Sequence, residues 1–170
     1  DLNIPDAQKD LLKKLVKTGK PVVLVLFAGR PLTLVWEEEN VPAILDVWFP
    51  GTEAGYAVAD VLFGDVNPSG KITATFPRSV GQVPISYNYK HTGRAPLKEK
   101  PSEKYRTGYI DETYEPLYPF GYGLSYTQFE YSDLTLDKEV INSNEYLTAS
   151  ITITNKGTVD GKEIVQLYLR

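Results

Sequence analysis

The apolar positions at the start of the chain follow the period of a helix. Four of them share one helical face: Leu11, Leu12, Leu15 and Val16. Pro5 opens this segment at a first-turn position and Gly19 closes it. The continuous apolar run 21–27 (PVVLVLF) is typical of a strand buried on both faces of a parallel sheet. The pattern therefore predicts an amphipathic helix followed by a buried strand.

The next segments are less regular. The segment 32–40 (LTLVWEEEN) leaves helix and strand both open, whereas 43–49 (AILDVWF) is strand-length and interrupted only by Asp46, which predicts a second strand. Thr52 is a good N-cap residue, and helical spacing then continues to Gly64. The apolar positions of this predicted helix are Ala54, Ala57, Val58, Val61 and Leu62.

A turn over 65–70 leads into a run with the period of a half-buried strand. Ile72, Ala74 and Phe76 alternate with polar residues, so 71–76 is predicted to be a strand with one covered face. The order helix, strand, strand, helix, strand is that of part of a doubly wound α/β layer.

Prolines, glycines and tyrosines dominate the segment from Pro77 to about Tyr126. Nine of the 12 tyrosines lie between Tyr87 and Tyr131. A buried tyrosine ring still needs a partner for its hydroxyl, so we expect ordered, irregular structure packed against a domain surface.

The last part of the chain has the alternation of an all-β domain. Runs at 134–136 (LTL), 146–154 (YLTASITIT) and from 162 (KEIVQLYLR) predict strands, with a turn at 155–157, and the last two runs are expected to pair. An immunoglobulin-like sandwich needs about seven strands, so we expect a truncated second domain.

Composition excludes several classes of function. The net charge is −4 and no basic stripe occurs, so nucleic acid is not an expected partner. No apolar run approaches the length of a membrane span, and no segment resembles a signal peptide. With no cysteine and a single histidine, His91, neither thiolate nor multi-histidine metal sites can form, and no cofactor is expected.

Four segments, taken in this order, resemble the C-terminal half of family 3 glycoside hydrolases, and a fifth is similar to the start of the fibronectin type III-like domain that often follows it. The signatures PGTEAG, LFGDVNPSGK and PFGYGLSY carry the resemblance. The five segments are 20–34, 48–84, 87–94, 117–134 and 151–170.

The resemblance implies an α/β fold class in three parts. Residues 1–86 would be the C-terminal part of an α/β sandwich domain, 87–127 a connecting segment packed on the domains, and 128–170 the first strands of a truncated fibronectin type III-like, immunoglobulin-like sandwich. It also implies that the chain is a fragment of a periplasmic or secreted bacterial enzyme.

The implied enzyme is a retaining, exo-acting β-glycosidase, most simply a β-glucosidase that hydrolyses terminal β-linked sugars. Retaining glycosidases need two carboxyl groups about 5 to 5.5 Å apart. In this family the nucleophile is an aspartate of the preceding barrel domain, and the acid/base glutamate lies shortly before the helix that opens this chain. We therefore expect no catalytic residue here, an inactive isolated chain, and substrate binding through upstream domains.

Low-specificity candidates for substrate contact lie in the tyrosine-rich part. His91 and Arg94 belong to YNYKHTGR, and Tyr105 and Arg106 to YRTGYIDE; both segments offer the donors and rings that sugar binding uses. For His91 and its neighbours, packing is the favoured reading. The second segment could also reach a neighbouring subunit, as in a homodimer.

Other tempting residues are assigned structural roles. Glu37, Glu38 and Glu39 are interpreted as a solvated charged turn, Glu53 as a residue of a helix N-terminus and Asp65 as a turn residue. Gly51, Gly55 and Gly64 are not part of a phosphate loop, because neither GxGxxG nor GK[ST] occurs.

Two further hypotheses stay open. The chain could act alone as a carbohydrate-binding or structural module, as its tyrosine-rich middle suggests. A flavodoxin-like nucleotide domain is disfavoured by the missing phosphate loop. Three strands of a sandwich would expose an unpaired edge, so self-association or a partly disordered tail is also expected.

Overall fold

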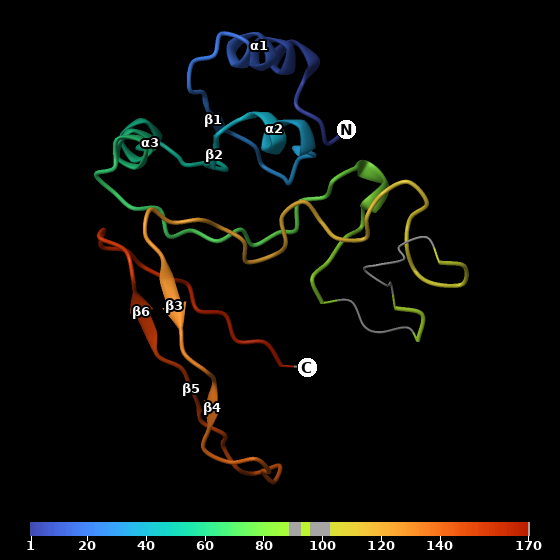
Figure 1. Ribbon diagram of the computed structural model, residues 1–170, viewed down its shortest axis with the longest axis vertical. Coiled ribbons are helices and arrows are strands. Elements are labelled where there is room, and N and C mark those ends of the chain that lie inside the picture. The colour runs from blue at the N-terminus through green and yellow to red at the C-terminus, as the bar shows by residue number, and fades with distance from the viewer. Residues whose placement is uncertain (89–92, 96–102, 170) are drawn as a thin grey trace. The chain divides into compact units, whose positions relative to one another are not determined.

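The computed structural model describes residues 1–88, 93–95 and 103–169, and it divides into two compact units. The first unit comprises Asp1–Val58 and Lys71–Tyr122, and the second comprises Ala59–Gly70 and Gly123–Arg170. Figure 1 labels the helices and strands.

The first unit contains a parallel βαβ arrangement preceded by a helix. Helix α1 (Asp6–Val16) precedes β1 (Val23–Leu26), α2 (Val35–Asn40) follows, and β2 (Ala43–Asp46) pairs with β1 in parallel. The predicted helix and both strands are confirmed, and the open segment 32–40 contains α2. The predicted burial of β1 on both faces is wrong, because Val23 is 48% exposed and only Leu26 of its four residues is buried. Strand β2 ends at Asp46 rather than at Phe49, because Trp48 has a φ of 49° and leaves the extended conformation.

The prediction of a regular strand at 71–76 is wrong. The segment runs antiparallel to 117–122, with backbone bonds from Ile72 N to Tyr122 O (2.8 Å) and from Phe76 N to Tyr118 O (2.9 Å). Only the Phe76–Tyr118 bridge forms. The partner segment contains Pro119, which has no N–H to donate, so a continuous ladder cannot develop.

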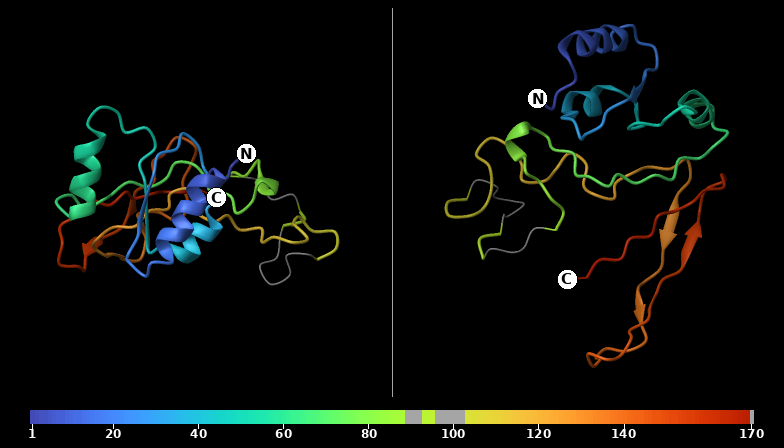
Figure 2. Two further views of the ribbon diagram at one scale, coloured as in Figure 1. Left: turned by 90° about the horizontal axis from the view of Figure 1, so that it is seen from above. Right: turned by 180° about the vertical axis from the view of Figure 1, so that it is seen from behind.

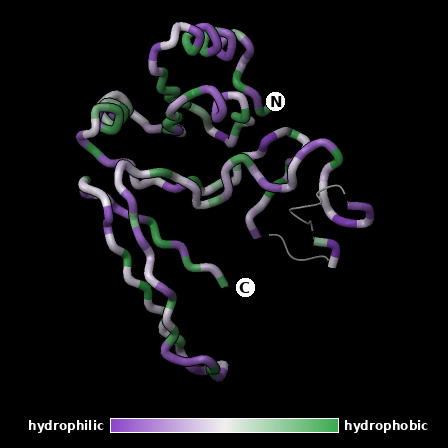
Figure 3. Tube along the Cα trace, in the orientation of Figure 1, coloured by the Kyte–Doolittle hydropathy of each residue, from purple (hydrophilic) through white to green (hydrophobic). Residues whose placement is uncertain are grey.

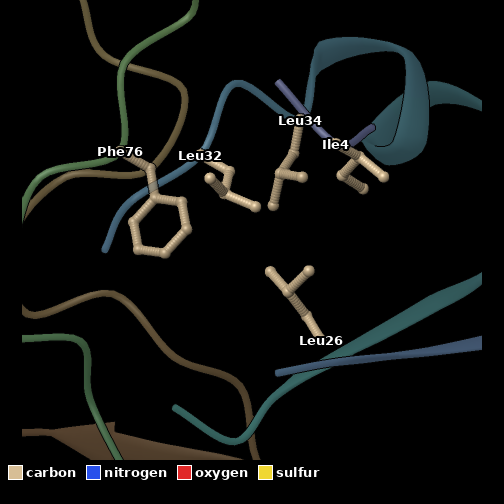
Figure 4. Packing of buried hydrophobic residues seen from close by; sticks show 5 residues of the cluster. All are labelled: Ile4, Leu26, Leu32, Leu34 and Phe76. Carbon is tan, nitrogen blue, oxygen red and sulfur yellow. The ribbon is translucent and has the colours of Figure 1, made fainter. Parts of the chain in front are cut away.

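The core of the first unit is small and apolar. Leu26 of β1 packs with four side chains that come from outside the helices and strands (Figure 4), and Trp48 and Tyr118 contact Phe76 edge to face at centroid distances of 5.9 and 6.0 Å. The four side chains are Ile4, Leu32, Leu34 and Phe76.

Helix α3 (Ala54–Phe63) is apolar but carries no buried residue. Figure 3 shows mostly hydrophobic and neutral colours along it. The helix begins at Ala54, and the carbonyl of Glu53 accepts the N–H of Ala57, so Glu53 and not Thr52 precedes the first turn. Gly64, at φ 87°, lies just beyond the last helical residue, in the left-handed conformation that glycine adopts without strain.

The second unit is a long antiparallel hairpin. Strand β3 (Phe129–Tyr131) pairs with β6 (Ile153–Asn155), and β4 (Thr135–Leu136) pairs with β5 (Ala149–Ser150); the right view of Figure 2 shows the two arms side by side. The predicted pairing of 146–154 with the run from 162 is wrong. The register of β5 and β6 matches the first arm of the hairpin, and residues 162–169 form no strand within the described part of the chain.

A bulge at Ser132 sets the faces of this hairpin. Four steps from Tyr131 to Thr135 oppose three steps from Ile153 to Ser150. The extra residue is accommodated because Thr152 N donates to the Ser132 side-chain oxygen (2.8 Å) while Ser132 N donates to Thr152 O (2.9 Å).

The bulge has a consequence for hydrophobic patterning. Residues directly opposite each other share a face, so Phe129, Tyr131 and Leu136 lie on the face of Ala149 and Ile153. In an unbroken register Leu136 would lie on the other face, beside threonines. The single extra residue therefore collects the apolar side chains of both hairpin arms on one side.

Candidate functional site

Three of the four predicted substrate-contact residues lie in two backbone segments that the first unit brings together. Thr107 N donates to Arg94 O at 2.9 Å, and the Arg106 side chain donates through Nη1 to Ala95 O at 3.3 Å. These bonds join 93–95 to 103–107. His91 lies outside the described residues.

Tyr105 occupies a strained position in the second segment. Its φ is 69°, a left-handed conformation that is uncommon for any residue but glycine, and it lies in a turn in which Arg106 N donates to Glu103 O (3.2 Å). The Tyr105 side chain is 73% exposed, and Lys104 Nζ lies 4.9 Å from its ring centroid. The turn therefore displays a phenol ring and its hydroxyl.

The side chains of Arg94 and Arg106 differ in their interactions. Arg106 Nε lies 3.1 Å from Glu103 Oε2, an ion pair between half-exposed side chains that orients the guanidinium. The Arg94 side chain is exposed and has no hydrogen-bond partner among the described residues. Arg94 and Tyr105 thus offer donors, and Tyr105 an aromatic ring, for the hydroxyls and the apolar face of a sugar.

A buried glutamine, which the sequence pattern did not single out, anchors this region. Gln82 is 1% exposed, and its Oε1 accepts Arg78 N at 2.7 Å. Its Nε2 donates to Thr113 O at 2.8 Å and to Glu115 O at 3.3 Å. We call these three bonds the Gln82 clamp. The clamp ties the end of segment 103–115 to the 3-10 turn Val80–Gln82.

Ring contacts support the same part of the first unit. Tyr87 stacks on Phe120 with a centroid distance of 4.3 Å, and Tyr118 stacks on Tyr122 at 5.0 Å. Burial, helped by the charge of Glu38, raises the pKa of the Tyr118 phenol to about 12. Tyr87, Tyr118 and Tyr122 therefore serve packing within the first unit.

The interpretation of Glu37 as a solvated residue is wrong. Glu38 and Glu39 are exposed, but Glu37 is 0% exposed, and Lys9 Nζ lies 3.2 Å from its Oε1. Glu37 lies in the first turn of α2 and Lys9 lies in α1, so their ion pair turns one face of this short helix toward α1. A helix places adjacent residues on different faces, so a run of three glutamates cannot share one environment.

Asp46 ends β2 at the carboxyl edge of the parallel pair. Its Oδ1 accepts Trp48 N at 3.4 Å, and its Oδ2 is buried without a hydrogen-bond partner in the described part of the chain. Burial raises the pKa of this carboxyl group, and the bond from Trp48 partly opposes the shift. This side chain places an acid group at that edge of the sheet.

The described residues offer no metal site: no group of three or more His, Asp or Glu side chains has the geometry to hold an ion. Gly51 and Gly64 have φ values of 77° and 87° and flank α3, in agreement with helix-start and helix-stop roles. Within the same ranges no helix is long and apolar enough to cross a membrane.

Comparison with known proteins identifies the family of this chain, which the geometry of the site does not. Residues 1–126 match the Glycosyl hydrolase family 3 C-terminal domain. The chain belongs to glycoside hydrolase family 3. This match confirms the family to which the sequence signatures point.

Two relatives in particular are much longer than this chain. It is 53% identical over 170 residues to a periplasmic β-glucosidase of Salmonella typhimurium, covering 100% of this chain and 22% of the relative. It is 47% identical over 174 residues to a β-xylosidase of Formosa agariphila, again covering 100% of this chain and 22% of the relative. The sequence thus spans about a fifth of each protein.

Solved structures show the same relation. A crystal structure of a β-glucosidase from Listeria innocua in complex with glucose has a TM-score of 0.88 and 46% identity, covering 94% of this chain and 22% of that chain. A β-glucosidase 3B from Thermotoga neapolitana has a TM-score of 0.69 and 34% identity, covering 92% and 22%. The chain therefore has the fold of the corresponding part of these enzymes.

Proposed function

We propose that this chain is part of a retaining, exo-acting β-glycosidase that removes terminal β-linked sugars, with β-glucosides as its substrates. The observation that carries the proposal is 53% identity over the full 170 residues to a protein named as a periplasmic β-glucosidase. The chain's role is that of scaffold, because the resemblance to family 3 implies that the nucleophile and the acid/base of the retaining mechanism lie in other segments of the enzyme.

The test compares the longer protein with the isolated chain. The longer protein is expected to hydrolyse aryl β-glucosides faster than aryl β-xylosides, and the pure 170-residue chain is expected to hydrolyse neither. The xyloside is included because a β-xylosidase is 47% identical. Turnover by the isolated chain would refute the scaffold role, and a preference for the xyloside would reassign the sugar.

We propose the following architecture for the longer protein. Residues 1–86 end an α/β sandwich domain, 87–127 connect, and 128–170 begin a fibronectin type III-like sandwich. The parallel β1–β2 pair supports the first assignment and the antiparallel hairpin the last. Limited proteolysis checks it: cuts are expected between the domains and not within α3.

We also propose a location and a subunit contact. The name of the Salmonella relative supports a periplasmic or secreted enzyme. Exposed apolar residues such as Ile110, 96% exposed, support a homodimer or another burial of this surface in the longer protein. Fractionation of cells and light scattering on the purified protein test the two statements.

A carbohydrate-binding module is the second candidate. The exposed Tyr105 ring favours it, together with Arg94 and Arg106 of the same two bonded segments, since aromatic rings and bidentate donors recognise sugars. Calorimetry of the isolated chain against cello- and xylo-oligosaccharides separates the two functions. A clear micromolar isotherm supports a binding module, and its absence leaves the scaffold role.

A further inference from the structure

We propose that Gln82 is a positioning residue that holds segment 103–115 in place so that Tyr105 and Arg106 contact the glycoside. The inference rests on the proposed glycosidase function. It concerns a residue that touches neither the sugar nor the reacting atoms.

The clamp joins segments that are distant in the sequence. Thr113 lies 31 residues and Glu115 lies 33 residues beyond Gln82, and both give their backbone carbonyls to its side-chain amide. The opposite end of the amide accepts Arg78 N, so all three bonds must form together for a side chain that is 1% exposed. A buried amide with its partners in place fixes the backbone that it bonds.

Segment 103–115 has a second anchor at its other end. Thr107 N bonds to Arg94 O at 2.9 Å, and Glu103 fixes Arg106 through an ion pair of 3.1 Å. Tyr105 and Arg106 lie just before Thr107, in a turn that includes a φ of 69° at Tyr105, and the clamp holds the same segment beyond Thr107. A strained turn persists only when its surroundings hold it, so removal of the clamp is expected to release the display of both side chains.

The experiment uses the longer protein and two substitutions that differ in what they remove. Gln82→Met is close to Gln in volume and removes all three bonds without adding charge. Gln82→Glu retains the acceptor for Arg78 N but loses the donor to Thr113 and Glu115. Gln128→Glu, at an exposed position, makes the same chemical change where no clamp exists.

Both Gln82 variants are expected to raise KM for an aryl β-glucoside about tenfold while kcat changes less than about twofold, as for the loss of a correctly placed binding group. Trypsin is expected to cut after Lys104 and Arg106 at least about tenfold faster in the variants than in the wild type, because cleavage follows local opening. Gln128→Glu is expected to change neither value.

Unchanged KM together with unchanged cleavage in a folded Gln82→Met protein overturns the proposal, and so does a loss confined to kcat. If both Gln82 variants fail to fold, Glu103→Ala provides the test, because this exposed substitution removes both the charge and the hydrogen-bond acceptor that orient Arg106. An unchanged KM in Glu103→Ala then overturns it. A wild-type protein with no glycosidase activity refutes the proposed function instead, and the trypsin comparison still reports on the clamp.

Discussion

The Asn67 side-chain oxygen accepts the backbone N–H of Tyr126 at 2.8 Å, although 59 residues separate the two. The same oxygen accepts the Ser125 hydroxyl at 2.9 Å, and the Asn67 Nδ2 donates to Asp160 O at 2.9 Å. Tyr126 in turn donates its hydroxyl to Val61 O at 2.8 Å. Parts of two family signatures, DVNPSG of LFGDVNPSGK and GLSY of PFGYGLSY, therefore meet within the second unit through one amide.

Asn67→Asp tests the amide's double role. The substitution keeps the acceptor for Ser125 and Tyr126 but removes the donor to Asp160 O, so we expect a loss of about 1–2 kcal/mol in the free energy of unfolding. Thermal melts of the two proteins measure it. Asn144→Asp, at an exposed position, is the control and is expected to melt like the wild type. Equal melting temperatures of Asn67→Asp and the wild type would contradict the role of the Asn67 amide as a link between these segments.

Local periodicity could predict part of this fold. The helix at Asp6–Val16 and the strands Val23–Leu26 and Ala43–Asp46 follow from apolar spacing within a few residues. The helix Ala54–Phe63 follows for the same reason. What decides each of these elements lies inside its own segment.

The residues that join distant segments within each unit, Gln82 of the candidate site among them, could not be found in this way. Gln82 and Asn67 have partners 31 to 93 residues away, and no period marks a buried amide. Glu37 was misread because its environment depends on Lys9 of another helix. The single extra residue at Ser132 changes the face of every later side chain in that arm, and only the register reveals it.

The Lys9–Glu37 ion pair predicts strong dependence between the two positions. Lys9→Met leaves a 0% exposed carboxylate without its cation, and we expect a loss of about 3 kcal/mol in stability. Lys9→Met combined with Glu37→Met is expected to recover most of this loss, because an apolar pair carries no desolvation cost. Lys14→Met, exposed on the same helix, serves as the control in the thermal melts. Additive losses in the double variant would contradict the pairing.

The raised pKa of Tyr118 predicts how the free energy of unfolding falls at alkaline pH. Its phenol has an ordinary pKa of 10.0, raised in the folded protein to about 12 mainly by burial. The folded state therefore holds this proton more tightly, so the stabilisation is complete below pH 10 and is lost as the pH rises toward 12.

The measurement for Tyr118 compares the wild type with Tyr118→Phe, which has no proton to lose. Unfolding midpoints in denaturant, taken across this alkaline range, should fall less steeply for Tyr118→Phe than for the wild type. Tyr146→Phe, at a 91% exposed position, should follow the wild type. Parallel slopes for all three proteins would show that the Tyr118 environment does not bias its ionisation.

Gly157 is the hairpin position at which an added side chain would meet the closest contact. A Cβ on this residue would press on Oγ1 of Thr127 and lie 3.3 Å from the Thr127 Cα. The Thr127 hydroxyl donates to Asn155 Oδ1 at 2.6 Å at the end of β6, so it cannot move without losing that bond. We expect Gly157→Ala to lower stability by about 1–3 kcal/mol, the range that overpacking produces.

Two further proteins separate this steric effect from the general cost of replacing glycine. Gly70→Ala has no atom within 4 Å of the added carbon and is expected to melt like the wild type. Thr127→Ala removes the obstructing oxygen, so Gly157→Ala is expected to cost less in the Thr127→Ala background than in the wild type. Equal costs of Gly157→Ala in both backgrounds would mean that Thr127 is not the obstacle, and that the hairpin end relaxes around the added methyl group.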